Sequence, residues 1–275
     1  LYKKYAPSIN FADEEEAAGL RGLRDLGIPE GAKFVCLTIR DSAYLASHLP
    51  GHDFDYHSFR DCDVANYEQG CIALAEAGIF VVRMGARVEK ELPFSHPRVV
   101  DYATNGMRSE FLDLYLASQC LFCITNGTGF DALPMIFRRP ILQLNAAPIS
   151  HAYTWGVNSM VLFKHHLDVV TGRELTLSQI FGRQVDTAQR TDVFAARKVM
   201  LLDNSAEEIV EVVMEMVERL SGDWTADSED EMLQQNFWKI FCSGQKSGPN
   251  GQQLHGHINA IYGSRYLRAN GWWLE

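Results

Sequence analysis

The chain has 275 residues, of which 47% are apolar and 22% are charged, and its formal net charge is −10. This apolar content is enough for a folded core and excludes global disorder. The acidic balance disfavours general binding to DNA, RNA or anionic membranes, whereas a small phosphorylated ligand needs only local positive charge.

The predicted elements alternate between helices and buried strands over the first half of the chain. Residues 11–31 read as a helix with acidic residues in its first turn, and "KFVCLTI" (33–39) reads as a buried parallel strand. Residues 41–63 are polar and contain three histidines, which predicts a long loop. The next expected elements are helix 64–78, strand 79–85, strand 98–103, helix 110–119 capped by Ser109, strand 121–125, a helix that starts near Phe130 to Leu133, and strand 140–144.

This alternation predicts an α/β protein with a doubly wound, Rossmann-like parallel sheet. Beyond residue 145 the pattern is weaker, apart from a serine-capped amphipathic helix at 205–222 and a second helix at 227–244. We therefore divide the chain into a helical lead-in (1–32), a Rossmann-like domain (33–204) and a helical C-terminal tail that packs on it (205–275).

The cysteines and histidines do not match a metal-binding or disulfide pattern. The six cysteines lie mostly in apolar segments, which favours buried free thiols in a reducing compartment. The histidines are spread over loops, and the neighbours His165 and His166 would point apart on a strand or a helix. No apolar stretch has the length of a membrane helix and no signal peptide is visible, so we expect no metal and a cytoplasmic protein.

Polar residues follow four of the predicted strands, at the edge where parallel sheets bind ligands. They fall into four clusters: Arg40-Asp41-Ser42, Arg83-Met84-Gly85, Asp101-Tyr102, and Thr125-Asn126-Gly127-Thr128-Gly129. Arg40 is the sharpest of these signals, because an arginine fork suits a phosphate. Arg83 could instead form a surface ion pair, and Asp101 and Tyr102 could be a cap and a packing residue.

The glycine-rich turn at 126–129 could bind an anion through free backbone amides at the start of a helix. An ordinary tight turn between a strand and a helix is the competing interpretation. Gly127-x-Gly129-x-x-Ala132 also fits a dinucleotide fingerprint, but it follows a late strand, and the acid that such folds place about twenty residues on is absent. Asp41, His57 and Asp61 are candidate general bases, each with a structural alternative.

The order of several segments resembles a group of bacterial proteins regarded as glycosyltransferases of surface polysaccharide synthesis. The segments are "VCLTIRDSAYL", "YHSFRDCDVANY", "VVRMG", "VVDYA", "RSEFLDLYLASQCLFCITNGTG", "FRRPILQLN" and "TGRELTLSQIF". The strand, arginine and turn arrangement is more distantly similar to the donor half of fucosyltransferases with the GT-B fold.

This resemblance implies a GT-B C-terminal-type domain and a role for each cluster. Arg40, with Asp41 beside it, would be the diphosphate arginine of the catalytic pair. Thr125, Asn126, Gly127, Thr128 and Gly129 would form the phosphate turn, Asp101 and Tyr102 would contact the base, and Arg83 would contact the substrate. The acceptor half of a complete GT-B enzyme is missing or much reduced in these residues.

The expected function is transfer of a sugar from a nucleotide diphosphate sugar to a glycan or lipid-linked acceptor, without metal or cofactor. We also expect peripheral membrane association through partner proteins, and we expect no binding to nucleic acid. Two alternatives stay open at this point. One is an NAD-dependent oxidoreductase with a Rossmann domain, and the other is a catalytically inactive nucleotide-binding or scaffold module.

Overall fold

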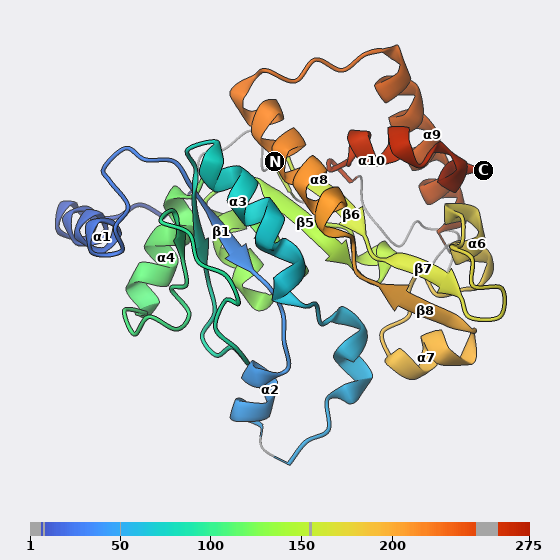
Figure 1. The fold of residues 1–275 in the computed structure, drawn as a ribbon, viewed down its shortest axis with the longest axis horizontal. Helices are drawn as coiled ribbons and strands as arrows, with labels where there is room; N and C mark the ends of the chain where they lie inside the picture. The colour runs from blue at the N-terminus through green and yellow to red at the C-terminus, as the bar shows by residue number, and fades with distance from the viewer. Residues whose placement is uncertain (1–6, 8, 50, 154–155, 246–257) are drawn as a thin grey trace.

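The computed structural model describes residues 7, 9–49, 51–153, 156–245 and 258–275. Its centre is a seven-stranded sheet in which every pairing is parallel, with the strand order β3-β2-β1-β4-β5-β6-β9 (Figure 1). The predicted α/β class with a parallel sheet is thereby confirmed. The strands are β1 (Phe34–Thr38), β2 (Phe80–Arg83), β3 (Val99–Val100), β4 (Cys123–Thr125), β5 (Ile141–Ala146), β6 (Met160–Phe163) and β9 (Ile261–Tyr262).

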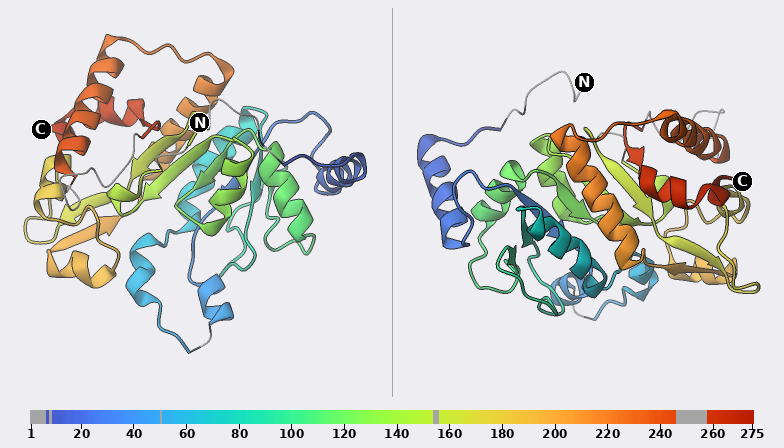
Figure 2. Two further views of the ribbon diagram at one scale, coloured as in Figure 1. Left: turned by 180° about the vertical axis from the view of Figure 1, so that it is seen from behind. Right: turned by 45° about the horizontal axis from the view of Figure 1, so that its top comes forward.

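Helices cover both faces of this sheet. Helices α3 and α8 lie side by side on one face, and α4 and α5 lie on the other (Figures 1 and 2). The helices in chain order are α1 (Asp13–Asp25), α2 (Ala43–His48), α3 (Glu68–Glu76), α4 (Glu110–Gln119), α5 (Ala132–Ile136), α6 (Leu177–Gly182), α7 (Thr191–Ala196), α8 (Ala206–Ser221), α9 (Ser228–Gly244) and α10 (Ser264–Ala269). Short 3₁₀ segments include η1 (Asp55–Arg60), η2 (Val64–Tyr67) and η3 (Gly129–Asp131).

The two hydrophobic cores explain why the central strands are apolar throughout. Val35 and Leu37 of β1 belong to the core beneath α3 and α8, whereas Phe34 and Cys36 point into the core shared with α1 and α4. A strand covered on both faces needs apolar residues at every position. The continuous run at 33–39 is therefore the signature of its central place in the sheet.

The helix ends follow local sequence signals. The Ser109 side chain accepts a hydrogen bond from the amide of Leu112, and Ser205 accepts one from Glu208, as the predicted caps require. Gly222 ends α8 with a left-handed backbone (φ 86°). Helix α1 covers Asp13–Asp25 of the segment predicted at 11–31, and Gly27, two residues beyond its end, has a positive φ (77°).

Several elements differ from the sequence-based expectation. The long loop predicted at 41–63 contains α2 and η1, and the strand predicted at 98–103 has only two residues. Strands β7 (His165–Asp168) and β8 (Val199–Leu202) form a separate antiparallel ribbon. The tail at 205–275 does more than pack on the sheet, because it supplies the edge strand β9. Within the described residues, no helix combines the length and apolarity needed to cross a bilayer.

The strand order places a topological switch point between β1 and β4. From β1 the chain builds outward through β2 and β3, and from β4 it builds in the opposite direction through β5 and β6. In open α/β sheets, ligands bind beyond the carboxyl ends of the strands where the order reverses. The exits of β1 and β4 are therefore the first place to look for a functional site.

Candidate functional site

A cavity of about 440 Å³ lies at this switch point. Its walls come from the exit of β1 (38–41), helix α2, the segment after β2 (84–88), the turn after β4 (128–130) and the start of α4. Three arginines line it, Arg40, Arg87 and Arg108, together with the carboxylates of Asp41 and Asp113. Its size is within the range of small-molecule sites.

Two hydrogen bonds join the exit of β1 to the turn after β4. The hydroxyl oxygens of Thr38 and Thr128 are 3.0 Å apart. The backbone amide of Arg40 donates to Oδ1 of Asn126 at 2.8 Å. The structure thus brings Arg40 and the glycine-rich turn together at one cavity, although they are more than eighty residues apart in sequence.

The side chain of Asn126 is buried and connects neighbouring segments through hydrogen bonds. Besides accepting from Arg40, it donates through Nδ2 to the carbonyl of Arg60 at 2.8 Å and contacts the sulfur of Cys62 at 3.1 Å. The residue is 2% exposed. In this structure Asn126 therefore has no free side-chain group with which to make the predicted phosphate contact.

The turn amides are largely occupied as well. The amide of Gly127 donates to Oγ1 of Thr125 at 3.0 Å, and the amide of Thr128 donates to Oδ2 of Asp131 at 2.9 Å. Asp131 is buried, and this burial raises the pKa of its carboxyl group. Of the five predicted turn residues, only Thr128 and Gly129 line the cavity. Thr125, Asn126 and Gly127 belong to the part of the turn that does not line the cavity.

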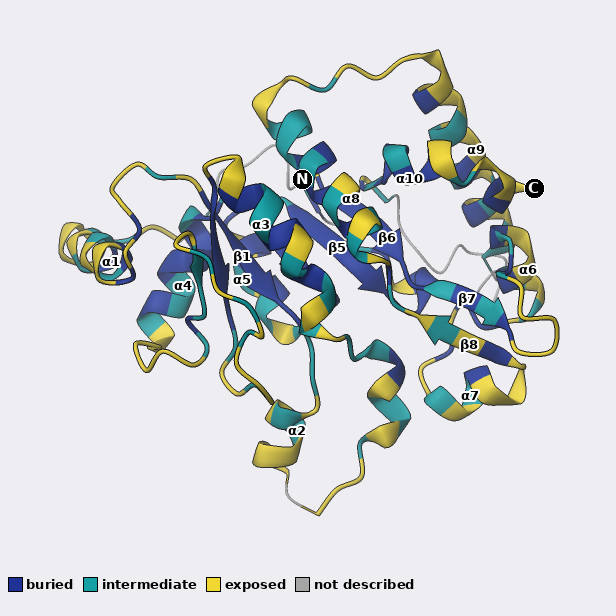
Figure 3. Cartoon of the chain, viewed as in Figure 1, coloured by how far each residue is buried: buried dark blue, intermediate teal, exposed yellow. Residues whose placement is uncertain are grey.

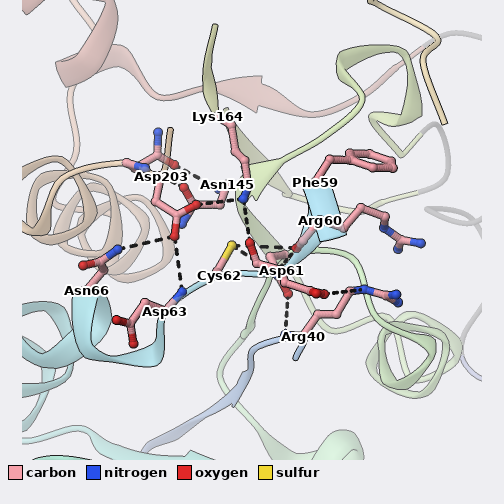
Figure 4. A network of polar contacts seen from close by, with 12 residues as sticks. Arg40, Phe59, Arg60, Asp61, Cys62, Asp63, Asn66, Asn145, Lys164 and Asp203 are labelled. Atoms are coloured by element: carbon pink, nitrogen blue, oxygen red, sulfur yellow. Dashed lines mark hydrogen bonds and ion pairs between the residues drawn. The ribbon is translucent and has the colours of Figure 1, made fainter. Parts of the chain in front are cut away.

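The guanidinium group of Arg40 lines the cavity, with 17% of its side chain exposed. Its Nε donates to Oδ1 of Asp61 at 3.0 Å (Figure 4), and its two terminal nitrogens form no hydrogen bond with any described residue. Arg60 lies close enough that burial and the charge of Arg40 lower its pKa. Burial raises the pKa of Asp61, although Arg40 opposes this effect. Asp61 thus has two guanidinium groups near it, while Asp41 is a second carboxylate close enough to act on its pKa.

An ion pair between the buried Lys164 and the partly buried Asp203 holds the segment that carries Asp61. Nζ of Lys164 lies 2.7 Å from Oδ1 of Asp203 and donates to the backbone carbonyl of Asp61 at 2.7 Å (Figure 4). Asp203 also accepts from the amide of Asp63 at 3.3 Å and from Nδ2 of Asn66 at 3.4 Å. Sequence reasoning missed this clamp. Its one signal was that Lys164 directly follows an apolar run, as Arg40 does.

Arg83, Asp101 and Tyr102 do not line the switch-point cavity. Arg83 is 2% exposed, and its Nη1 donates to the carbonyl of Lys90 at 2.7 Å and to the carboxylate of Asp101 at 3.3 Å. The hydroxyl of Tyr102 is buried and exchanges hydrogen bonds with the backbone of Ser109. These three residues hold the segment between β2 and α4, and the contacts with a base predicted for Asp101 and Tyr102 find no support in this placement. Arg83, predicted to contact the substrate, lines a second cavity of about 260 Å³.

Asp41 stands between two cavities. Its Oδ1 accepts from the amide of Ala43 at 3.0 Å, and its Oδ2 accepts from the amide of Glu89 at 2.8 Å. The residue lines both the switch-point cavity and this second cavity. The second cavity is also lined by the acidic residues Asp63 and Glu89 and by the basic residues Arg83 and Lys90. Asp41 thus shapes the wall that the two cavities share.

Three further residues of the cavity were not predicted from the sequence. Arg87 is exposed and forms no ion pair with a described residue, whereas Arg108 pairs with Asp113 at 2.6 Å. The ring of Tyr44 is stacked on His48 with 4.0 Å between centroids, and the residue is 46% exposed. Their signals were weak, because all three lie in loops or in the short helix α2, where the sequence pattern predicted only a polar segment.

The other candidate groups lie elsewhere. His57 lines neither of these two cavities, and its pKa is lowered by burial and by Arg40, Arg60 and Arg190. His165 and His166 do occupy opposite faces of β7. No group of three or more His, Cys, Asp or Glu side chains in the described ranges is placed to hold a metal ion.

The dinucleotide fingerprint has the wrong position in the topology. In a dinucleotide-binding fold the glycines follow the first strand of the sheet. Here β1 is followed by Arg40-Asp41-Ser42, and Gly127-x-Gly129 follows β4. Such a fold also needs an acidic residue at the end of the second strand to bind the ribose. Here β2 ends in Arg83, which is buried and paired with Asp101.

Comparison with known proteins identifies no relative of this chain. The sequence matches no protein family, no curated protein and no solved structure.

Proposed function

We propose that this protein binds a nucleotide diphosphate sugar in the switch-point cavity and transfers the sugar to an acceptor. It would act as a glycosyltransferase or as the donor-binding domain of one, with a GT-B-type arrangement. The observation that carries the proposal is the meeting of the Arg40 guanidinium with Thr128 and Gly129 at one cavity. The resemblance of the ordered sequence segments supports the same assignment.

The arginines supply the charge that a diphosphate needs. The free terminal nitrogens of Arg40 can bind two phosphate oxygens at once, and Arg87, in the segment after β2, adds an exposed cation. Asp131 and the hydroxyl group of Thr125 each occupy one turn amide that the sequence assigned to the phosphate. The proposal therefore rests on side-chain cations and on close approach at Gly129 more than on a cradle of backbone amides.

The remaining walls suit the other parts of the ligand. The ring of Tyr44 offers an aromatic surface on which a nucleobase can stack. Asp41, at the wall shared with the second cavity, can accept the proton of an acceptor hydroxyl bound there. The hydroxyl oxygen then bonds to the anomeric carbon while the bond to the diphosphate breaks. Arg40 and Arg87 stabilise the charge that the leaving diphosphate gains.

Calorimetric titration with UDP, GDP and CMP sugars tests donor binding, with Arg40→Ala as the variant. Loss of this contact should weaken binding by about 2–5 kcal/mol. Arg21→Ala is the matched control, because Arg21 is an exposed arginine of α1 that does not line the cavity. Equal affinity in the wild type and Arg40→Ala would remove Arg40 from the site, and no binding of any nucleotide sugar by the wild type would refute the proposal.

The open alternatives give different results in companion measurements. Fluorescence titration with NADH would show saturable binding if the protein were a dinucleotide-dependent oxidoreductase. Nucleotide-sugar binding without release of nucleoside diphosphate, with or without oligosaccharide acceptors, would favour a nucleotide-binding scaffold module.

A further inference from the structure

The ribbon formed by β7 and β8 presents an exposed apolar surface. In its antiparallel register Leu167 pairs with Met200 and His165 with Leu202, and the amide of Val169 donates to the carbonyl of Lys198. Residues paired in this way share a face of the ribbon. The exposed apolar residues are Val169 (57%), Val170 (76%), Met200 (45%) and Leu202 (41%). Figure 3 shows the turn after β7 and much of β8 as exposed.

A groove of about 430 Å³ adjoins this surface. Val169 and Met200 form one side of it, and Phe59 of η1 together with Phe194 and Ala195 of α7 form another. The lining is mainly apolar, so the groove extends the exposed patch toward η1. The next residues after Phe59 are Arg60, which donates to the carbonyl of Gly127, and Asp61, which accepts from Arg40.

Uncompensated positive charge surrounds the patch. Arg173, Arg197 and Lys198 are exposed and form no ion pair with a described residue. The acidic side chains of the same segment are paired within the chain or buried: Asp168 with Arg183, Glu174 with His165, Asp192 with Arg190, Asp203 with Lys164, and Asp186 in the interior. The surface formed by residues 164–203 is therefore cationic in a protein whose net charge is −10, and Asp55 of η1, across the groove, is an exposed acidic residue beside it.

We propose that the β7–β8 ribbon docks the protein on an anionic lipid bilayer. Apolar side chains with flanking Lys and Arg are the combination that binds the interface of such membranes. Charges beyond about 10 Å are screened at physiological salt, so the acidic remainder of the protein does not cancel the local attraction. A second copy of the chain would present the same three cations to the patch, which makes a bilayer the better electrostatic match. The inference does not depend on the proposed chemistry.

Sedimentation with vesicles tests this docking, using phosphatidylcholine alone and an equal mixture with phosphatidylglycerol. We expect the wild type to bind the mixed vesicles, to bind pure phosphatidylcholine far less, and to dissociate as salt rises. Arg173→Gln with Lys198→Gln should lower the partition coefficient about 25-fold, because each cation near an anionic surface contributes about 1 kcal/mol. Val169→Ser with Val170→Ser should also abolish most binding.

Matched controls keep the result interpretable. Arg21→Gln with Lys33→Gln removes two exposed cations at the other end of the molecule and should leave vesicle binding unchanged. Circular dichroism and thermal melting should show that all variants fold, since every changed side chain is exposed. Absence of wild-type binding to mixed vesicles, or binding that the ribbon variants do not weaken, overturns the proposal. Concentration-dependent dimers that Met200→Glu dissolves, without vesicle binding, would assign the patch to self-association and overturn it as well.

Discussion

The backbone amide of Arg40 donates to Oδ1 of Asn126, so the second residue beyond β1 is held by the first residue beyond β4. The same side chain reaches the carbonyl of Arg60 and the sulfur of Cys62. One asparagine thereby fixes three segments around the switch point, and its removal should disturb the fold as well as the cavity.

Asn126→Ala should destabilise the protein by roughly 2–4 kcal/mol. The change removes three contacts of a buried side chain and leaves the amide of Arg40 and the carbonyl of Arg60 without their partners. Urea unfolding measures the loss, and Gln69→Ala, at an exposed position of α3, serves as the control. A change below about 0.5 kcal/mol, the level typical of surface substitutions, would contradict the assigned role.

Gly127 and Gly129 differ in what they require of the backbone, which makes them a matched pair. Gly127 has φ 94°, a conformation that strains other residues, whereas a Cβ at Gly129 would meet no atom within 4 Å. Gly127→Ala should lose about 1–2 kcal/mol of stability, and Gly129→Ala should lose none. Thermal unfolding of the two variants separates these cases.

The same pair probes the proposed ligand. If a phosphate approaches the turn closely, the added methyl of Gly129→Ala should reduce nucleotide-sugar affinity about tenfold without affecting stability. Full affinity in this variant would place the phosphate away from the turn and leave Arg40 and Arg87 as its binding groups.

Sequence reasoning succeeded where the signal is local and failed where it depends on distant partners. The strands at 33–39 and 79–85 and the caps at Ser109 and Ser205 follow from runs and spacings within a few residues. The engagement of Asn126 could not be foreseen, because its partner Arg60 is 66 residues away in the chain. Strand β9 has only two residues, so its place beside β6 comes from tertiary pairing and leaves no periodic pattern.

The candidate site shows the same division. Sheet topology alone predicts that the exits of β1 and β4 meet, and the structure places Arg40 and Thr128 accordingly. The sequence could not show that Asp131 would occupy a turn amide, or that Arg83 would be buried against Asp101. The functional roles assigned to these positions stay predictions until ligand binding is measured.

Lys164 and Asp203 provide a double-mutant cycle for the clamp on the Asp61 segment. Lys164→Met leaves Asp203 without its charged partner and should cost about 3 kcal/mol. Lys164→Met with Asp203→Leu should recover much of this loss, because no unpaired buried charge is left. Urea unfolding of the two single variants and the double variant gives the coupling energy. Strictly additive effects would show that the two side chains do not act as a pair.

His165 should make the stability of the protein depend on alkaline pH. Its Nδ1 lies 2.7 Å from Glu174 and its Nε2 lies 2.8 Å from Glu208, so both ring nitrogens face carboxylates. Burial lowers the pKa of His165, but the two glutamates outweigh it and raise the pKa to about 10. The folded-state pKa exceeds the unfolded value of about 6.5, so the imidazolium contributes its full stabilisation below pH 6.5.

This contribution should disappear as pH rises from about 6.5 to about 10, with a loss of roughly 2–4 kcal/mol. Urea unfolding of the wild type across this range measures it, and His165→Gln removes the titrating group. The variant should be less stable than the wild type at pH 6, and the difference should shrink toward pH 10. His166 cannot cause this change of stability with pH, because burial lowers its pKa to about 4 and keeps the ring neutral throughout the range. A difference between wild type and His165→Gln that does not change with pH would show that the glutamates do not hold a charged imidazole.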